Sequence, residues 1–274
     1  MGEISLKSRL LPGEHPPPLT CDALLALVSG TQKPTVWSLL VTVFGDLAQD
    51  EGARISGAVL GRLTHLMGIK PEATRVALHR LRKDGWLASE RRGRSSDYFL
   101  TPWGRAQSAA ATPRIYAANS GVTDAWLVLT DPNRPAGGHE QAETWITASM
   151  MITTQKPDAQ DVFATRIDET ALPEWMSAKV CPPTLAKLSG NLADQFHDLN
   201  AAVSDASDLT PLEITALRVM IVHSWRRIVL KTPALPDHVF PEAWAGATCR
   251  ALVSTLLQQL PRQALNDLEA TAVL

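Results

Sequence analysis

The 274-residue sequence lacks the marks of several large protein classes. It has only three cysteines, Cys21, Cys181 and Cys249, which are far apart and form no C-x-x-C pair. This spacing argues against a disulfide framework and a structural zinc site. No apolar run approaches the roughly 18 residues of a transmembrane helix, and the N-terminal segment lacks the hydrophobic region of a signal peptide. We therefore expect a cytoplasmic protein with no membrane partner.

Motifs of common catalytic sites are also missing. The chain has no G-x-x-x-x-G-K-[ST] phosphate loop, no G-x-G-x-x-G after a strand, no G-x-S-x-G turn and no H-E-x-x-H pair. Its seven histidines are scattered. We therefore expect no enzymatic activity, no cofactor and no metal site.

The composition indicates a folded protein with uneven charge. Hydrophobic residues make up 45% and charged residues 20% of the chain, and the length fits two or three domains. The net charge is only -2, but residues 54–105 hold eleven Lys or Arg against four Asp or Glu. Elsewhere 24 acidic residues outnumber 15 basic ones. A basic segment in an acidic chain indicates one domain that faces a polyanion.

The basic segment has the element order of a winged helix-turn-helix. Apolar residues between Val36 and Leu47 recur at steps of three and four, which predicts a helix. Ser56 is a candidate cap for a second helix, and a third follows from Pro71. The runs WLASERR and DYFLT flank Gly93 and predict a two-stranded hairpin.

The third predicted helix has the arrangement of a recognition helix. Its apolar face is expected to be buried, while Arg75, His79 and Arg82 share the opposite face at positions i, i+4 and i+7. Such donors reach base edges in the major groove, and arginines on the hairpin turn reach phosphates. A solvated surface helix is the alternative, which the concentration of charge disfavours. The residues that we expect to contact DNA are Lys70, Thr74, Arg75, His79, Arg82, Arg91, Arg92, Arg94, Ser95 and Ser96.

The rest of the chain completes a mostly helical fold with α+β elements. Strand-like runs at 123–131, 146–154 and 161–168 predict a small α+β domain, and leucine-rich helical stripes in the last third predict a core or a dimer seam. We expect an N-terminal arm (1–33), a winged-helix domain (34–105), a linker (106–119), an α+β middle domain (120–182) and a helical C-terminal effector and dimerisation domain (183–274). Within these bounds we expect one helical turn at residues 22–28 and a short fourth helix that starts at Thr101.

Two blocks of this sequence resemble a known family. The segment RVALHRLRKDGWLASERRGRSSDYFLTPWGRA and the segment VHSWRRIVLKTPALPDHVFPEAWAGATCRAL are similar to the PaaX-like transcriptional regulators, the phenylacetic acid degradation repressors. The resemblance implies a winged helix, a ferredoxin-like middle domain, a helical C-terminal domain and a homodimer. It also implies a repressor that binds a double-stranded operator of an aromatic catabolic operon and is released by an aryl-acyl-CoA such as phenylacetyl-CoA.

The second block holds the residues that we expect to bind this effector. An apolar pocket is needed for the aryl end and arginines for the phosphates. Trp225 is a candidate for the pocket, Arg226 and Arg227 for the phosphates, and His223 for an additional donor. The plainer alternative is that Trp225 and His223 are buried structural residues and that the arginines form ion pairs.

Two other functions remain open at this point. Asp131 follows a predicted strand at the place where a nuclease related to the middle domain would hold a metal, although an Asp-Pro pair is also a common loop start. In this alternative, the chain is a nucleic-acid-processing enzyme that uses the middle domain. An architectural DNA binder without an effector is the other alternative.

Overall fold

The computed structural model describes residues 20–29, 35–93, 95–132, 143–158, 161–168, 172–204 and 209–273. Over these residues the chain is mostly helical, with two small antiparallel sheets. The helices are α1 (Cys21–Ser29), α2 (Val36–Leu47), α3 (Gly57–Leu66), α4 (Pro71–Lys83), α5 (Pro102–Tyr116), α6 (Glu174–Val180), α7 (Pro183–Ser204), α8 (Pro211–Val229), α9 (Gly246–Gln259) and α10 (Leu265–Val273), with a short 3-10 helix at Asp237–Val239. The strands are β1 (Ile55–Ser56), β2 (Leu87–Arg92), β3 (Ser95–Leu100), β4 (Trp126–Leu129), β5 (Glu143–Thr147), β6 (Met150–Thr153) and β7 (Phe163–Arg166).

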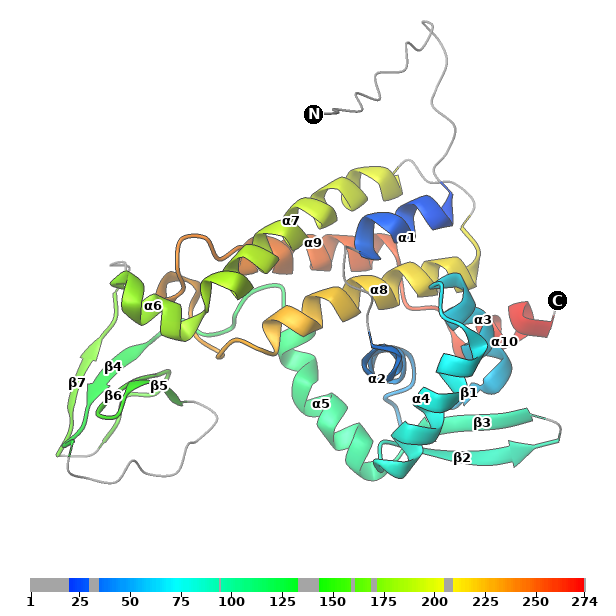
Figure 1. The fold of residues 1–274 in the computed structure, drawn as a ribbon, viewed down its shortest axis with the longest axis horizontal. Helices are drawn as coiled ribbons and strands as arrows, with labels where there is room; N and C mark the ends of the chain where they lie inside the picture. Colours follow the sequence, from blue (N-terminus) through cyan, green and yellow to red (C-terminus); the bar gives the residue numbers. More distant parts are fainter. Residues whose placement is uncertain are drawn as a thin grey trace, which may run out of the picture.

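One hydrophobic core joins the N-terminal helices to the C-terminal helices. Buried side chains of α1 to α4 and of α7 to α9 form a continuous cluster. Helix α8 contacts α1, α2, α3, α7 and α9, and Figure 1 shows it running between α7 on one side and α2 on the other. The largest fully buried side chains of this core include Phe44, Phe196 and Trp225. The winged-helix and C-terminal segments, which the sequence suggests as separate domains, therefore share one core.

The elements expected between residues 34 and 105 are present. Ser56 caps α3 by accepting a hydrogen bond from the backbone N–H of Val59 at 3.2 Å, and Pro71 opens α4. Gly68 and Gly85 have φ values of 71° and 77° after α3 and α4. This left-handed conformation suits glycine and ends each helix. The three strands pair in the order β1-β3-β2.

Both ends of this unit hold longer helices than the sequence predicts. Residues 21–29, expected in the N-terminal arm, form α1, whose Leu24 and Val28 are buried against α7 and α8. The remainder of that arm lies outside the described residues, except Thr20. Most of the expected linker at 106–119 belongs to the 15-residue helix α5, which packs on α2 and α8. Helix α5 shows no apolar periodicity in the sequence, because two of the residues that it buries, Gly104 and Ser108, are small and not strongly apolar.

The middle segment forms the second sheet, with a small core of its own. Its four strands are antiparallel in the order β5-β6-β4-β7. Ile146, Ile152 and Met176 of α6 belong to this core, together with Leu235 and Val239 from beyond α8. The run at 146–154, expected as one strand, contains the turn between β5 and β6, so it contributes to two strands. Figure 1 shows this sheet at the end of the molecule opposite the β2–β3 hairpin.

The described residues also bear on two absences expected from the sequence. The three cysteines are buried and unbonded to one another. Within the described ranges no helix is both long and apolar enough to cross a membrane.

Candidate nucleic-acid interface

Helices α3 and α4 are fixed to one another by a buried polar contact as well as apolar packing. The hydroxyl of Thr74 on α4 donates to the hydroxyl of Thr64 on α3 at 3.0 Å, and both side chains are buried. Ala77, Leu78 and Leu81 complete the buried side of α4. Thr74 was expected at the DNA surface, and this expectation is wrong. Its short polar side chain faces α3, where the Thr64 hydroxyl satisfies it.

The opposite side of α4 is exposed and cationic. Arg75, His79 and Arg82 are exposed, as the sequence predicts, and so are Arg80 and Lys83. Lys70, the N-cap residue of α4, is also exposed. With its back held by α2 and α3, α4 presents this row to solvent as a recognition helix must.

An exposed valine on this face was missed by sequence reasoning. Val76 is 69% exposed, the largest fraction among the large apolar side chains that the structure describes as exposed. It follows Arg75 and lies one turn before His79 and Arg80 on the same surface. The sequence held a signal for this residue. Val76 is apolar but lies beside the cationic positions of α4, on the side that was expected to be polar.

The β2–β3 hairpin carries a second group of cations beside α4. Arg91 pairs with Ser96 and Arg92 with Ser95 across the two strands, and Gly93 follows with a φ of 62°. Arg91, Arg92 and Ser95 are exposed, and Ser96 is half-buried. The hydroxyl of Ser95 donates to the Arg92 carbonyl at 3.3 Å. Arg94 lies outside the described residues.

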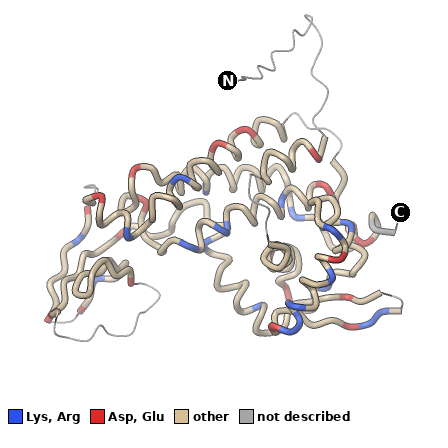
Figure 2. Tube along the Cα trace, in the orientation of Figure 1, with Lys and Arg blue, Asp and Glu red and all other residues tan. Residues whose placement is uncertain are grey.

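The four acidic residues of segment 54–105 form ion pairs with arginines of the same segment. Glu72 lies 3.8 Å from Arg75, Asp84 lies 3.5 Å from Arg80, Asp97 lies 3.8 Å from Arg92, and Glu90 pairs with Arg54. The pairs at Arg54, Arg75 and Arg80 have both partners exposed, and exposed pairs contribute little and exchange readily, whereas the Asp97 side chain is only 11% exposed. Figure 2 shows Lys and Arg gathered on α4 and toward the hairpin end. Arg75 and Arg80 of α4 can therefore exchange their exposed carboxylate partners for phosphates at a small cost in free energy.

The expected effector residues lie in a different place. Trp225 is fully buried, and its indole N–H donates to the Ile115 carbonyl at 3.1 Å. His223 is 1% exposed. Arg226 donates to the carbonyl of Ser38 at 3.0 Å and lines a small cavity of 40 Å³. The structure thus does not bring these three side chains around an effector pocket, because all three are used to hold α8 to α2 and α5.

Polar side chains at one-turn intervals form the seam between α2 and α8. On α2 the sequence places Ser38, Thr42 and Asp46 at i, i+4 and i+8. Arg226 of α8 donates to Thr42 Oγ1 at 2.9 Å, and His223 Nδ1 lies 3.0 Å from the same oxygen. We call these contacts, with the Asp46 pair described next, the α2–α8 seam.

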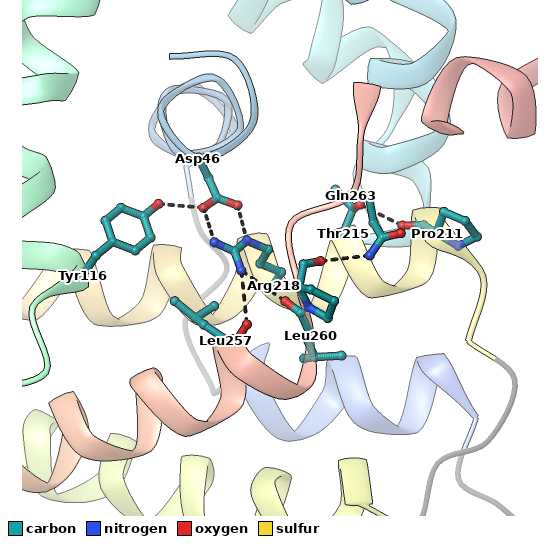
Figure 3. Close-up of polar contacts among 9 residues, drawn as sticks. Asp46, Tyr116, Pro211, Thr215, Arg218, Leu257, Leu260 and Gln263 are labelled. Carbon is teal, nitrogen blue, oxygen red and sulfur yellow. Dashed lines mark hydrogen bonds and ion pairs between the residues drawn. The ribbon is translucent and has the colours of Figure 1, made fainter. Parts of the chain in front are cut away.

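The deepest contact of the seam is a buried ion pair. Figure 3 shows Arg218 of α8 facing Asp46 of α2, with Nε and Nη2 at 2.8 and 3.0 Å from the two carboxylate oxygens. Tyr116 donates its hydroxyl proton to the same carboxylate at 2.7 Å. Arg218 Nη1 also donates to the carbonyl of Leu260 at 3.1 Å, beyond α9. Four segments of the chain therefore meet at one carboxylate–guanidinium pair.

The seam holds His223 in its neutral form. Thr42 Oγ1 accepts a hydrogen bond from Arg226 and lies 3.0 Å from His223 Nδ1 and 3.2 Å from the Ser38 carbonyl oxygen. His223 Nε2 is buried without a partner among the described residues. Burial, reinforced by the charges of Arg226 and Arg227, lowers the pKa of His223 to about 3.

The candidate metal-binding acid of the nuclease alternative finds no support. Asp131 is exposed after β4. Among the described residues no group of three His, Cys, Asp or Glu side chains is placed to hold a metal ion.

Comparisons with known proteins match two parts of the chain. Residues 35–104 match the family model "PaaX-like protein", and residues 184–270 match "PaaX-like protein C-terminal domain". The curated protein "Transcriptional repressor PaaX" of Escherichia coli is 29% identical over 269 residues, which cover 87% of this chain and 82% of that protein.

Among solved structures, the uncharacterized protein Rv0674 from Mycobacterium tuberculosis aligns with a TM-score of 0.45 and 20% identity. The alignment covers 86% of this chain and 98% of that chain, but a TM-score below 0.5 supports no conclusion about this fold. The two family models together cover more than half of the residues, in the order found in the sequence blocks, and the chain belongs to the PaaX-like family.

Proposed function

We propose that this chain is a DNA-binding transcriptional repressor. The observation that carries the proposal is the exposed cationic face of α4, whose other side is packed on α2 and α3. A helix fits the major groove, and clustered cations bind phosphates by releasing counterions. The curated relative, named a transcriptional repressor, and the match of both family models support the same function.

The arrangement of the N-terminal unit supports a winged helix-turn-helix. Its elements follow as α2, β1, α3, α4, β2 and β3, and the sheet order is β1-β3-β2. In this proposal Lys70, Arg75, His79 and Arg82 lie along the major groove. The β2–β3 hairpin is the wing, and Arg91 and Arg92 contact phosphates.

Val76 is proposed as an additional base contact. Its exposed methyl groups lie between the cationic side chains of α4, where thymine offers a methyl group in the major groove. This contact reads A·T pairs without a hydrogen bond.

The finer parts of the function follow from the family. The antiparallel order β5-β6-β4-β7 supports a ferredoxin-like middle domain. The controlled operon is proposed to serve phenylacetate-type degradation, with release by an aryl-acyl-CoA. A homodimer is proposed because one winged helix contacts too few base pairs for an operator. Two-fold symmetry then gives half-sites separated by about 10 bp or a multiple of it.

The test of the proposal is DNA binding measured by fluorescence anisotropy. Duplexes that the wild-type protein selects from a random library are compared with random duplexes at several salt concentrations. Replacing Arg91, Arg92 and Arg94 by Ala should weaken binding to both, and should reduce the salt slope by about 0.9 for each lost phosphate contact. Arg166→Ala, at an exposed arginine of the second sheet, is the matched control. A wild-type protein that binds no duplex rejects the proposed function.

A catalytic or effector-free alternative would give different results. Cleavage of the duplex on addition of Mg²⁺ would indicate a nuclease. Stable binding that no aryl-acyl-CoA changes would indicate an architectural DNA binder. Light scattering on the free protein separates the proposed dimer from a monomer.

A further inference from the structure

A pocket of 140 Å³ opens between α1, α7 and the C-terminal end of α8. Its apolar lining comes from Val28 of α1, Leu185 and Leu192 of α7, and Ile228 of α8. A cavity of roughly 150 Å³ with aliphatic walls is large enough to bind benzene. This pocket therefore has room for one ring-sized apolar group.

The rim of the pocket is polar and cationic. Arg227 and Lys231 line it from the end of α8, with Ser224 beside them and Asn191 across on α7. Cations next to an apolar pocket favour a ligand that carries an anionic group on its apolar part. Leu188, which also lines the pocket, is 47% exposed although it belongs to the apolar stripe of α7. A ligand that lies over the pocket would cover it.

We propose that this pocket binds a small molecule that joins a ring-sized apolar group to an anionic group, and that binding there changes DNA affinity through α8. The inference rests on the proposed function, whose effector it places. Of the effector residues expected from the sequence, only Arg227 lines this pocket.

The pocket and the α2–α8 seam use neighbouring residues of α8. Ser224 follows His223, and Arg227 follows Arg226, so these two pocket residues are each adjacent to a residue that contacts Thr42 or Ser38 of α2. The two sets point to different sides of the same two helical turns. A ligand that shifts the end of α8 therefore disturbs the contacts to α2, which packs directly on α4.

The end of α8 has a second connection to the DNA-binding unit. Arg114 of α5 donates to the carbonyls of Val229 and Thr232 at 2.5 Å each. Helix α5 begins at Pro102, two residues after the last residue of β3. Movement at the pocket thus reaches both α4, through α2, and the hairpin, through α5.

The site is tested by calorimetry on the full chain without DNA. Three probes are used. Phenylacetyl-CoA has a phenyl ring and phosphates, phenylacetate has the phenyl ring and a carboxylate but no phosphate, and coenzyme A has the phosphates but no phenyl ring. Lys231→Glu should weaken phenylacetyl-CoA binding by at least about tenfold, because a charge-assisted contact becomes repulsive. Ser224→Trp should fill the pocket and abolish binding. Lys187→Glu, an exposed lysine of α7 outside the pocket, is the matched control.

Lys231 is exposed, whereas Ser224 is half-buried. The Lys231→Glu variant should therefore keep the wild-type fold, which circular dichroism checks. Loss of binding in Lys231→Glu but not in Lys187→Glu supports the site. Unchanged phenylacetyl-CoA binding in both pocket variants overturns it, and so does a wild-type protein that binds none of the three probes.

Coupling to DNA is measured separately, so that its failure is distinguishable from failure of the proposed function. Linkage requires that duplex DNA lower the affinity for phenylacetyl-CoA by the factor by which the probe lowers the affinity for DNA. Equal probe affinity with and without bound duplex overturns control through α8. A protein that binds the probe at this pocket but binds no duplex rejects the repressor and the coupling, while the small-molecule site stands.

Discussion

Arginines on the exposed face of α4 and arginines in the α2–α8 seam differ in almost every physical respect. The Arg75 side chain is 75% exposed and lies 3.8 Å from an equally exposed glutamate. The Arg218 side chain is 10% exposed and is bonded to Asp46, which is 1% exposed. An exposed pair contributes little to stability, whereas a buried pair loses several kcal/mol when one partner is removed. The same residue type therefore stays accessible to a ligand on α4 and holds helices together in the seam.

The largest expected effect on stability comes from replacing Arg218. Arg218→Met leaves the Asp46 carboxylate buried without its cation and should lower the free energy of unfolding by about 3–5 kcal/mol. Urea denaturation followed by circular dichroism measures the change. Arg82→Met, the same substitution on exposed α4, should stay within about 0.5 kcal/mol of the wild type. Equal midpoints for Arg218→Met and the wild type would contradict the role of the seam.

A pH titration sharpens the same comparison at His223. The unfolded chain takes up a proton near the ordinary pKa of about 6.5, while the folded imidazole stays neutral down to a pKa of about 3. Between these values the unfolded state binds more protons, so stability should fall as the pH falls, by about 1.4 kcal/mol per pH unit. It should be regained above pH 6.5.

The control for this titration is a histidine that the seam does not hold. In His223→Asn the dependence on pH should flatten over this range, although the variant is less stable at pH 7. His197→Asn, at an exposed position of α7, should keep the wild-type dependence. A wild-type protein as stable at pH 5 as at pH 7 would show that His223 is not held neutral.

The smallest expected effect concerns Val76. Replacing each thymine of a selected duplex by deoxyuridine removes one methyl group, which should weaken binding by about 0.8 kcal/mol at the contacted position. In Val76→Ala the same replacement should have no further effect, because the partner methyl groups are gone. Fluorescence anisotropy measures both. Equal losses in the variant and the wild type at every thymine would remove Val76 from the base contacts.

Local sequence patterns predicted the DNA-binding unit well for a physical reason. Helices α2, α3 and α4 each have a clear apolar period. Gly68 and Gly85, which have positive φ values, follow α3 and α4, and Gly93 lies at the hairpin turn. These signals act over a few residues. Thr74 was misplaced because a threonine on an amphipathic helix is typical of a surface, and its partner Thr64 lies in another helix.

The seam and α5 depend on contacts that no local pattern carries. Asp46 and Arg218 are 172 residues apart, and Thr42 and His223 are 181 apart. In the sequence, Arg226 is indistinguishable from a phosphate-binding arginine. Helix α5 looked like a linker because its alanines, serines and Pro113 lack an apolar face, yet α2 and α8 provide its stability.

The central claim is that α4 reads base sequence, and Arg75→Ala tests it most directly. Anisotropy titrations compare the variant with the wild type on a selected duplex and on a random duplex of equal length. A bidentate arginine–guanine contact contributes about 1–3 kcal/mol of discrimination, so affinity for the selected duplex should fall by roughly that amount while affinity for the random duplex falls little. Equal loss on both duplexes would show that Arg75 contacts only phosphate. Unchanged binding to both would contradict the claim that α4 enters the groove.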